Sequence, residues 1–320
     1  NDADKKKTII VRCKEFPGIA LQTALEGRRV STDFYEIYET DQTTFKDDFW
    51  QILTSEQMVL KAKISEFPIL DNYLVIKEGF VTGKDDIFIR DISEIPKGEE
   101  GGYIPYLSDR EMDKYTVPKS TNRVVFYPYL NKVKLIEKDV KKHFPETWNY
   151  LRKNSKVLKG RKAAKDNPWW CPVRPRTPKD MLTPKIVSPH LVLLSKFSLD
   201  IEGKYGVSHC PLMYPKDPKG GIDILYYFLA VLNSSVAFWQ IANLSHKYSR
   251  GYFMLEPKTL KKLRVPDPAA IPSATMKKIY RLVKKRIEDS SSSVDVEIDN
   301  IIADIYGLSE GDRQEVGMEE

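Results

Sequence analysis

The feature that most constrains this chain is an apolar run over residues 222–244, whose centre extends without a break from Leu225 to Leu232. At about 20 residues, the run is long enough for a helix to span a bilayer. Asp223, Asn233 and several serine and amide side chains interrupt it, and polar groups are costly in hydrocarbon. We therefore expect a helix buried in a protein core, broken near Asn233, and no membrane-spanning segment.

The rest of the chain mixes short β-rich runs with helical patterns. Runs of β-branched and aromatic residues predict strands at 8–11, 74–76, 87–89, 124–127, 185–194 and 207–213. Apolar residues at helical spacing predict helices at 45–64, 146–158, 276–287 and 298–305. The fold class predicted is α+β: a mixed, largely antiparallel β-sheet with peripheral and C-terminal helices.

Breaks in these patterns predict where regular elements end. Residues 166–189 contain six prolines, so we expect an extended loop there. Trp148, Leu151 and Val157 are predicted to share the buried face of the helix at 146–158. Gly307 is suited to a left-handed helix C-cap, and we expect the last dozen residues to be a frayed tail.

The net charge of +6 is distributed unevenly along the chain. Residues 1–120 contain 17 Lys and Arg against 23 Asp and Glu, whereas residues 121–320 contain 34 against 22. A basic part joined to an acidic part predicts one surface that faces a polyanion.

The basic residues are densest in the segment 151–185, which holds 11 Lys and Arg but only two acids. Trp169 and Trp170 lie among them, close to Arg174 and Arg176. Cationic side chains neutralise phosphates, guanidinium groups can read guanine, and aromatic rings can stack on an extruded base. The alternative is a solvated basic surface with both tryptophans in the core.

A second basic cluster includes Lys247 and Arg250, with further lysines at 258, 261 and 262. Arg250-Gly251-Tyr252 can form a tight turn that brings the backbone close to a phosphate. An ordinary loop glycine is the alternative interpretation.

The cysteines and histidines point to no disulfide framework and no zinc site. Cys13, Cys171 and Cys210 are odd in number and far apart, and the four histidines lack metal-ligand spacing. A reducing, cytoplasmic setting is expected. The polar start without an initiator methionine favours a fragment of a longer chain.

Motifs for methyl transfer are missing from the sequence. No Phe-x-Gly-x-Gly is present, and Asp166-Asn167-Pro168-Trp169 is the nearest approach to the Asn/Asp-Pro-Pro-aromatic tetrapeptide of adenine methyltransferases. A magnesium-dependent nuclease is an alternative, because Glu202-Gly203-Lys204 with Asp180 upstream, and Glu256-Pro257-Lys258, have the local spacing of such sites.

An ordered series of short motifs carries a resemblance to a known family. Residues 79–88 match Gly-x-x-Thr-Gly-x-x-x-x-Phe, and residues 107–115 align Arg110 and Tyr115 with a Leu-x-Gly-Arg-Asp-Ile-x-Arg-Tyr run. Further matches follow at 144–161, with Trp169 after them, and then at Leu232-Asn233-Ser234, 250–252, 260–266 and 298–308. Over residues 73–310 the chain resembles the TaqI-like C-terminal specificity domains of N6-adenine DNA methyltransferases and single-chain type II restriction–modification enzymes.

The resemblance implies a target-recognition domain at 73–270, preceded by the end of a catalytic domain or a connector at 1–72 and followed by a helical segment at 271–320. It implies a module that reads duplex DNA without a catalytic centre of its own. S-adenosylmethionine, and magnesium if the parent also cleaves DNA, would bind to the rest of the parent chain, including its catalytic methyltransferase domain. A protein-interaction domain is a further alternative.

The DNA-binding residues that follow from these arguments share either a position in the family motifs or a place in a basic cluster. They are Thr82, Gly83, Lys84, Arg110, Tyr115, Lys159, Arg161, Trp169, Arg174, Arg176, Lys247 and Arg250. No catalytic or metal-binding residue is assigned. The hypothesis predicts that the basic members of this set converge on one face.

Overall fold

The computed structural model describes residues 7–13, 18–41, 53–161, 167–217, 221–289 and 292–318. The chain divides into two compact units, which are described separately. One consists of Asn1–Pro68 with Tyr306–Glu320, and the other of Ile69–Ile305. Predictions that concern residues 45–52 and Asp166 lie outside the described residues.

The first unit contains a three-stranded antiparallel sheet in the order β1-β3-β2. Its elements are β1 (Lys7–Cys13), α1 (Gly18–Leu25), β2 (Val30–Ser31), β3 (Tyr35–Asp41), α2 (Ser55–Ser65) and α13 (Glu310–Glu315). β1 confirms the strand predicted at 8–11. The helix predicted at 45–64 is confirmed over α2 but is wrong for residues 53 and 54, which precede the helix. α2 begins where Thr54 and Gln57 cap each other's backbone N–H groups.

The prediction of a frayed C-terminal tail is wrong for residues 310–315, which form α13. Gly307 does have the left-handed φ of +66° that was predicted. Beyond it, Ser309 and Asp312 form a capping box that starts a new helix. Lys63 pairs with Asp312 at 2.5 Å, and Gln57 donates to Glu315 at 2.6 Å. Contacts with α2 therefore hold the residues that were expected to fray.

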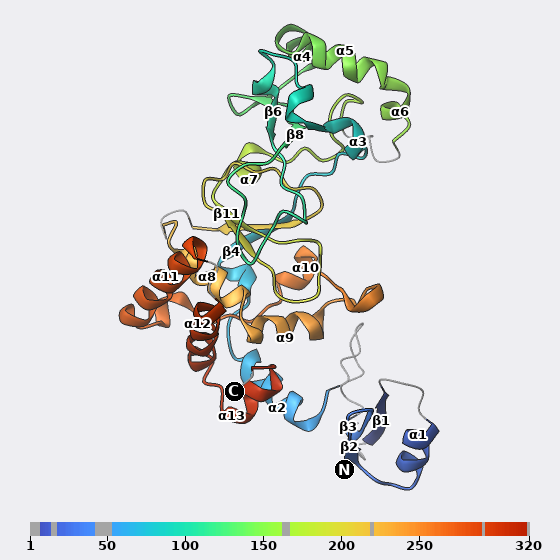
Figure 1. Cartoon of the computed structure of the whole chain (residues 1–320), viewed down its shortest axis with the longest axis vertical. Coiled ribbons are helices and arrows are strands. Elements are labelled where there is room, and N and C mark those ends of the chain that lie inside the picture. Colours follow the sequence, from blue (N-terminus) through green and yellow to red (C-terminus); the bar gives the residue numbers. More distant parts are fainter. Residues whose placement is uncertain are drawn as a thin grey trace, which may run out of the picture. The chain divides into compact units, whose positions relative to one another are not determined.

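The second unit contains most of the chain (Figure 1). Its strands are β4 (Leu74–Glu78), β5 (Ile89–Asp91), β6 (Tyr103–Pro105), β7 (Tyr115–Thr116), β8 (Arg123–Phe126), β9 (Tyr129–Leu130), β10 (Val133–Lys134), β11 (Lys185–Val187), β12 (Leu191–Val192), β13 (Ser198–Asp200), β14 (Pro211–Pro215) and β15 (Phe253–Met254). Its helices are α3 (Asp85–Phe88), α4 (Glu137–His143), α5 (Pro145–Lys153), α6 (Ser155–Lys159), α7 (Pro178–Met181), α8 (Ile224–Leu232), α9 (Ser235–Leu244), α10 (Pro257–Leu260), α11 (Ser273–Glu288) and α12 (Ser292–Ile305).

A five-stranded sheet in the order β4-β14-β11-β13-β7 forms the centre of this unit. Every neighbouring pair is antiparallel except β13 and β7. The strand predicted at 185–194 is divided into β11 and β12 by Ser188 and Pro189, because proline has no N–H for the ladder. The strand predicted at 207–213 begins later, at Pro211, after His209 adopts a φ of +58°. The predicted fold class, α+β with largely antiparallel sheets, is confirmed.

A smaller antiparallel sheet, β5-β8-β6, forms a core with α4, α5 and α6 (Figure 1). The strand predicted at 87–89 is wrong for its first two residues, which end α3. The helix predicted at 146–158 is interrupted at Asn154, whose side-chain amide donates to the Tyr150 carbonyl. Leu158 rather than Val157 completes the buried face, because a residue seven positions after Leu151 returns to the same side of a helix, whereas Val157 lies on the exposed side.

The apolar run at 222–244 forms α8 and α9, which meet at an angle of 63°. The predicted break near Asn233 is confirmed, since Ser234 caps α9 by accepting from Ala237 N. α8 is buried along most of its length, and α11 and α12 pack beside it. Among the described helices, none is individually long and apolar enough to cross a membrane, and the bent α8–α9 pair passes that test only by combined length and composition.

Candidate nucleic-acid interface

The motif at residues 79–88 forms a tight turn that presents Lys84 to solvent. The buried Thr82 hydroxyl accepts from Lys84 N at 3.0 Å and donates to the Asp85 carboxylate. Gly83 has a φ of +73°, and a Cβ there would lie 2.7 Å from Val173 Cγ2. Glycine is therefore required both by backbone conformation and by space. Thr82 and Gly83 shape the turn, and the Lys84 side chain is the exposed group.

Arg161 supports the same turn through hydrogen bonds. Its guanidinium donates to the carbonyls of Thr82, Trp169 and Cys171, and its Nε donates to the Leu158 carbonyl. Its charged end also lies 5.2 Å from the centre of the Phe88 ring. Desolvation lowers the pKa of Arg161. With these donors engaged, the side chain joins three segments of the unit rather than projecting into solvent.

The two adjacent tryptophans have different environments. Trp170 is fully buried, whereas Trp169 is partly exposed and packs against Trp148 with ring centres 5.3 Å apart. The ammonium of the exposed Lys159 lies 5.5 Å from the Trp169 ring. Trp169 therefore has the accessible edge that a nucleic-acid contact needs.

Arg174 and Arg176 share one carboxylate with a histidine. Arg174 pairs with Glu78 at 3.2 Å, Arg176 at 3.5 Å, and His209 Nδ1 lies 3.4 Å from the other oxygen of Glu78. Arg176 also donates from Nε to the Gly79 carbonyl at 2.9 Å and has a φ of +59°. Arg174 is the more exposed of the two arginines.

Arg110 and Tyr115 occupy opposite environments in the motif at 107–115. Arg110 is exposed. Its neighbour Asp109 accepts from Cys210 Sγ at 2.9 Å and from His190 N at 3.3 Å. Tyr115 is buried beneath Arg286, with a φ of +73°, and burial raises the pKa of its hydroxyl. Tyr115 therefore packs in the core.

Lys247 and Arg250 lie on one β-hairpin. The backbones of Lys247 and Phe253 form an antiparallel β-bridge, and Tyr248 N donates to the Tyr252 carbonyl at 2.6 Å. Arg250 and Gly251 form the turn, both with positive φ. Both basic side chains are exposed, and neither forms an ion pair with any part of the chain that the structure describes.

The structure brings several of these cationic groups close together. Val81 pairs with Arg174 through two backbone hydrogen bonds, which places Arg174 beside the turn at Gly83. A hollow of about 330 Å³ at this turn is lined by the charged residues Lys84, Lys156 and Arg161 together with glycines and valines, and no acidic residue lines it. Lys156 was not assigned from the sequence. The signal in the sequence is its spacing, because Lys156 precedes Gly160 by about one helical turn and belongs to the same basic segment as Lys159.

Contacts continue from this cluster toward the hairpin. His209 lies beside Glu78, and the next residue, Cys210, donates to Asp109, the neighbour of Arg110. Asp109 also accepts from the backbone of His190, which immediately precedes β12. β12 in turn pairs with β15 of the hairpin. The convergence of all the assigned residues on one DNA-facing surface stays a prediction.

The acids of the proposed nuclease patterns have partners within the fold. Asp180 accepts from Lys77 and Tyr214, both at 2.6 Å. Glu202 pairs with Lys204, and Glu256 pairs with Lys258. Across the described ranges, no group of three His, Cys, Asp or Glu side chains is arranged to hold a metal ion.

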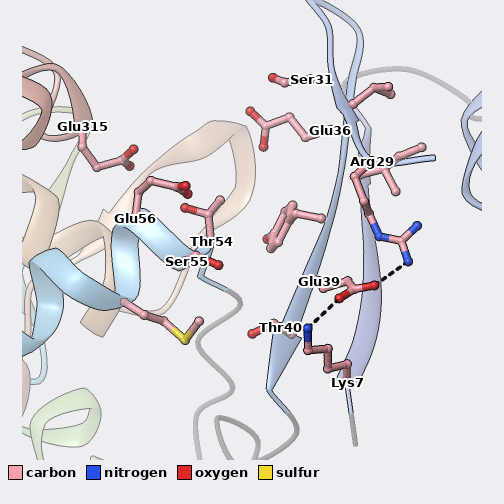
Figure 2. Close-up of a pocket in the computed structure, with 14 residues that line it drawn as sticks. Lys7, Arg29, Ser31, Glu36, Glu39, Thr40, Thr54, Ser55, Glu56 and Glu315 are labelled. Carbon is pink, nitrogen blue, oxygen red and sulfur yellow. Dashed lines mark hydrogen bonds and ion pairs between the residues drawn. The ribbon is translucent and has the colours of Figure 1, made fainter. Parts of the chain in front are cut away.

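The first unit contains a hollow of about 830 Å³ bordered by its sheet, the start of α2 and Glu315 (Figure 2). Figure 2 shows Glu39 between Lys7 and Arg29, with ion-pair distances of 3.2 and 2.8 Å. Both cations that line the hollow are thus paired with a carboxylate. This hollow differs from the turn at Gly83, where no acidic residue lines the space.

Comparison with known proteins shows that the chain is similar in sequence to a type II methyltransferase. The relative is the type II methyltransferase M.PaeR7I of Pseudomonas aeruginosa, with 25% identity over 298 residues, covering 92% of this chain and 49% of the relative. The chain thus spans about half the length of the curated relative it matches. No family model matches the chain.

Two solved structures are similar to the chain. The type IIL restriction–modification enzyme MmeI, solved in complex with DNA, matches with a TM-score of 0.52 and 9% identity over 73% of this chain and 33% of that chain. The type IIG restriction endonuclease BpuSI matches with a TM-score of 0.47 and 12% identity over 97% of this chain and 41% of that chain. The similarity to MmeI concerns the fold. Membership of the TaqI-like specificity-domain family stays a prediction.

Proposed function

We propose that this chain recognises a specific duplex DNA sequence as part of a restriction–modification enzyme. The observation that carries the proposal is the hollow at Gly83, which no acidic residue lines and which the exposed Lys84 and Lys156 border together with Arg161. Cationic side chains with free donors neutralise phosphates and release counterions. The homology to a type II methyltransferase supports a role in such a system.

The residues divide between positioning the DNA and reading it. Lys84, Lys156 and Lys159 would contact phosphates, because a flexible ammonium is a point charge without directional preference. Arg250, at the tip of a hairpin, would enter a groove, where its planar fork can bind guanine. Trp169 offers a partly exposed ring for stacking.

Methyl transfer itself is assigned to another part of the parent protein. This sequence contains neither a Phe-x-Gly-x-Gly nor an Asn/Asp-Pro-Pro-aromatic motif, and Asn167 uses its side-chain amide to bind the Val173 carbonyl and the Lys134 ammonium. The residues present do not form an S-adenosylmethionine site of that kind. The proposal therefore places S-adenosylmethionine, and the target adenine that the family resemblance implies, in the catalytic domain of the parent.

Selection from a pool of random-sequence duplexes tests the proposal with the purified full chain. We expect repeated selection to enrich one sequence pattern, and the affinity to fall steeply between about 50 and 200 mM salt. Lys84→Ala with Arg174→Ala should weaken binding. Lys138→Ala with Lys142→Ala, which removes two exposed lysines from α4, is the charge-matched control and should change binding little. Failure to bind DNA even at low salt, or binding without enrichment of any pattern, would falsify the proposal.

A further inference from the structure

The hairpin that contains Arg250 belongs to a small ribbon, in which β12 and β15 form a two-stranded sheet and Lys247 adds one isolated β-bridge. β12 pairs with β15 so that Val192 lies opposite Phe253, and Phe253 in turn bridges to Lys247. The pairing ends at Val192 in β12 and begins at Phe253 in β15. The loop after Val192 and the turn that contains Arg250 therefore leave the ribbon at the same end.

This end of the ribbon exposes large apolar side chains. Leu193 is 51% exposed, Leu194 is 69% exposed, and Tyr248, which follows the β-bridge at Lys247, is 53% exposed. Adjacent exposed leucines on a well-packed unit indicate a surface that functions in binding. Lys196 follows Leu194 by two residues, Lys247 and Arg250 lie on the hairpin that pairs with β12, and none of these three cations is ion-paired within the described chain. The surface has an apolar centre and a cationic border.

The loop that presents the leucines is anchored firmly at its base. The Ser188 hydroxyl donates to the Lys196 carbonyl at 2.8 Å and closes the loop. The buried Asn233 accepts from Phe197 N at 3.0 Å and donates to the Phe197 carbonyl at 2.9 Å. Asn233 lies at the corner between α8 and α9, so the loop is attached to the core of the unit. Such preorganisation lowers the entropy lost when the loop inserts into a partner.

We propose that Leu193 and Leu194 form an apolar wedge that inserts between base pairs of the bound duplex. The inference rests on the proposed function, and it assigns these residues a role in deforming the DNA. Apolar side chains placed between base steps partly unstack and kink a duplex, while neighbouring cations hold its phosphates. The cationic border favours DNA over a protein surface as the partner of this apolar centre.

The test uses the full chain and the duplex that it selects from the random pool, labelled with the fluorescent base 2-aminopurine at successive positions. Wild-type chain should increase the fluorescence at one step, because unstacking relieves quenching. Leu193→Ser with Leu194→Ser should abolish this increase and weaken binding about tenfold, since apolar burial at the step is lost. Leu194→Met should keep both effects because it remains apolar.

Leu182→Ser is the matched control, because Leu182 is also an exposed leucine of this unit. It should bind and increase the fluorescence as the wild-type chain does. If the double serine variant keeps wild-type affinity and fluorescence, the wedge is wrong while DNA recognition stands. If the wild-type chain selects no duplex, both the wedge and the proposed function are wrong.

Discussion

The basic segment around Arg161 and the hairpin around Arg250 are both positively charged, but their cationic groups have different partners. Arg161 donates to four backbone carbonyls, and Arg176 binds the Gly79 carbonyl and Glu78. Lys247 and Arg250 have no ion pair among the described residues and extend into solvent. Only cationic side chains whose N–H donors are not engaged within the fold are available to bind a nucleic acid. The number of basic residues in a sequence does not reveal how many of their donors are free.

Replacement of Arg161 should have the largest effect on stability. Arg161→Ala leaves several buried or half-buried carbonyls without donors, so we expect unfolding free energy to fall by about 3 kcal/mol. Denaturant titration of the purified chain would measure it. Lys159→Ala, two residues earlier and exposed, should change stability by less than about 0.5 kcal/mol. Similar small effects from both variants would contradict the structural role of Arg161.

Replacement of Arg250 should instead affect DNA affinity. Arg250→Ala should weaken binding to the selected duplex by about 1–3 kcal/mol, concentrated at one base pair, without loss of stability. Competition titration with single-base variants of that duplex would locate the position. Arg152→Ala removes an exposed arginine from α5 and serves as the control. Wild-type affinity and specificity in Arg250→Ala would show that the hairpin does not read DNA.

Lys156 and Lys159 test whether exposed lysines of the basic segment contact DNA, because they lie close in sequence to Arg161 but are exposed. Each alanine variant should reduce the slope of log affinity against log salt by about one unit, equally for all sequences. Equilibrium binding at several salt concentrations would measure the slope. An unchanged slope in both variants would place this part of the segment outside the DNA contact.

The smallest expected effect comes from the conformation of Arg250 itself. Its φ of +61° is unfavourable for a residue with a Cβ, whereas asparagine tolerates this region. Arg250→Asn should therefore increase unfolding free energy by about 0.5 kcal/mol while it weakens DNA binding. Thermal unfolding and a binding titration on the same sample would test both. A decrease in stability would mean that the arginine makes contacts that the free hairpin needs.

Local pattern predicted those parts of the fold that depend on neighbouring residues. The helical spacing of Ile279, Leu282 and Val283 predicted α11, and the polar residues at 233–235 predicted the bend between α8 and α9. The capping pattern of Ser309 and Asp312 is likewise local and is visible in the sequence.

Long-range contacts limited what the sequence could predict about the candidate site. Arg161 reaches Thr82, 79 residues earlier in the chain, and Tyr115 lies under Arg286, much later in the chain. Their motif positions gave no sign of these contacts. Trp169 and Trp170 are adjacent, so composition could not tell which of them would be exposed. Burial of such residues depends on the tertiary packing of distant segments.

Glu78 gives the cationic cluster an internal counterion. A phosphate that approaches Arg174 must compete with a carboxylate that is already in place 3.2 Å away. Non-specific binding to DNA therefore gains less free energy than the number of arginines suggests, because a phosphate must displace Glu78 from Arg174. At the recognised sequence, base contacts can offset the cost of breaking this ion pair. On this basis, Glu78→Gln should tighten binding to unselected DNA more than to the selected duplex, so that the carboxylate favours discrimination at the expense of affinity.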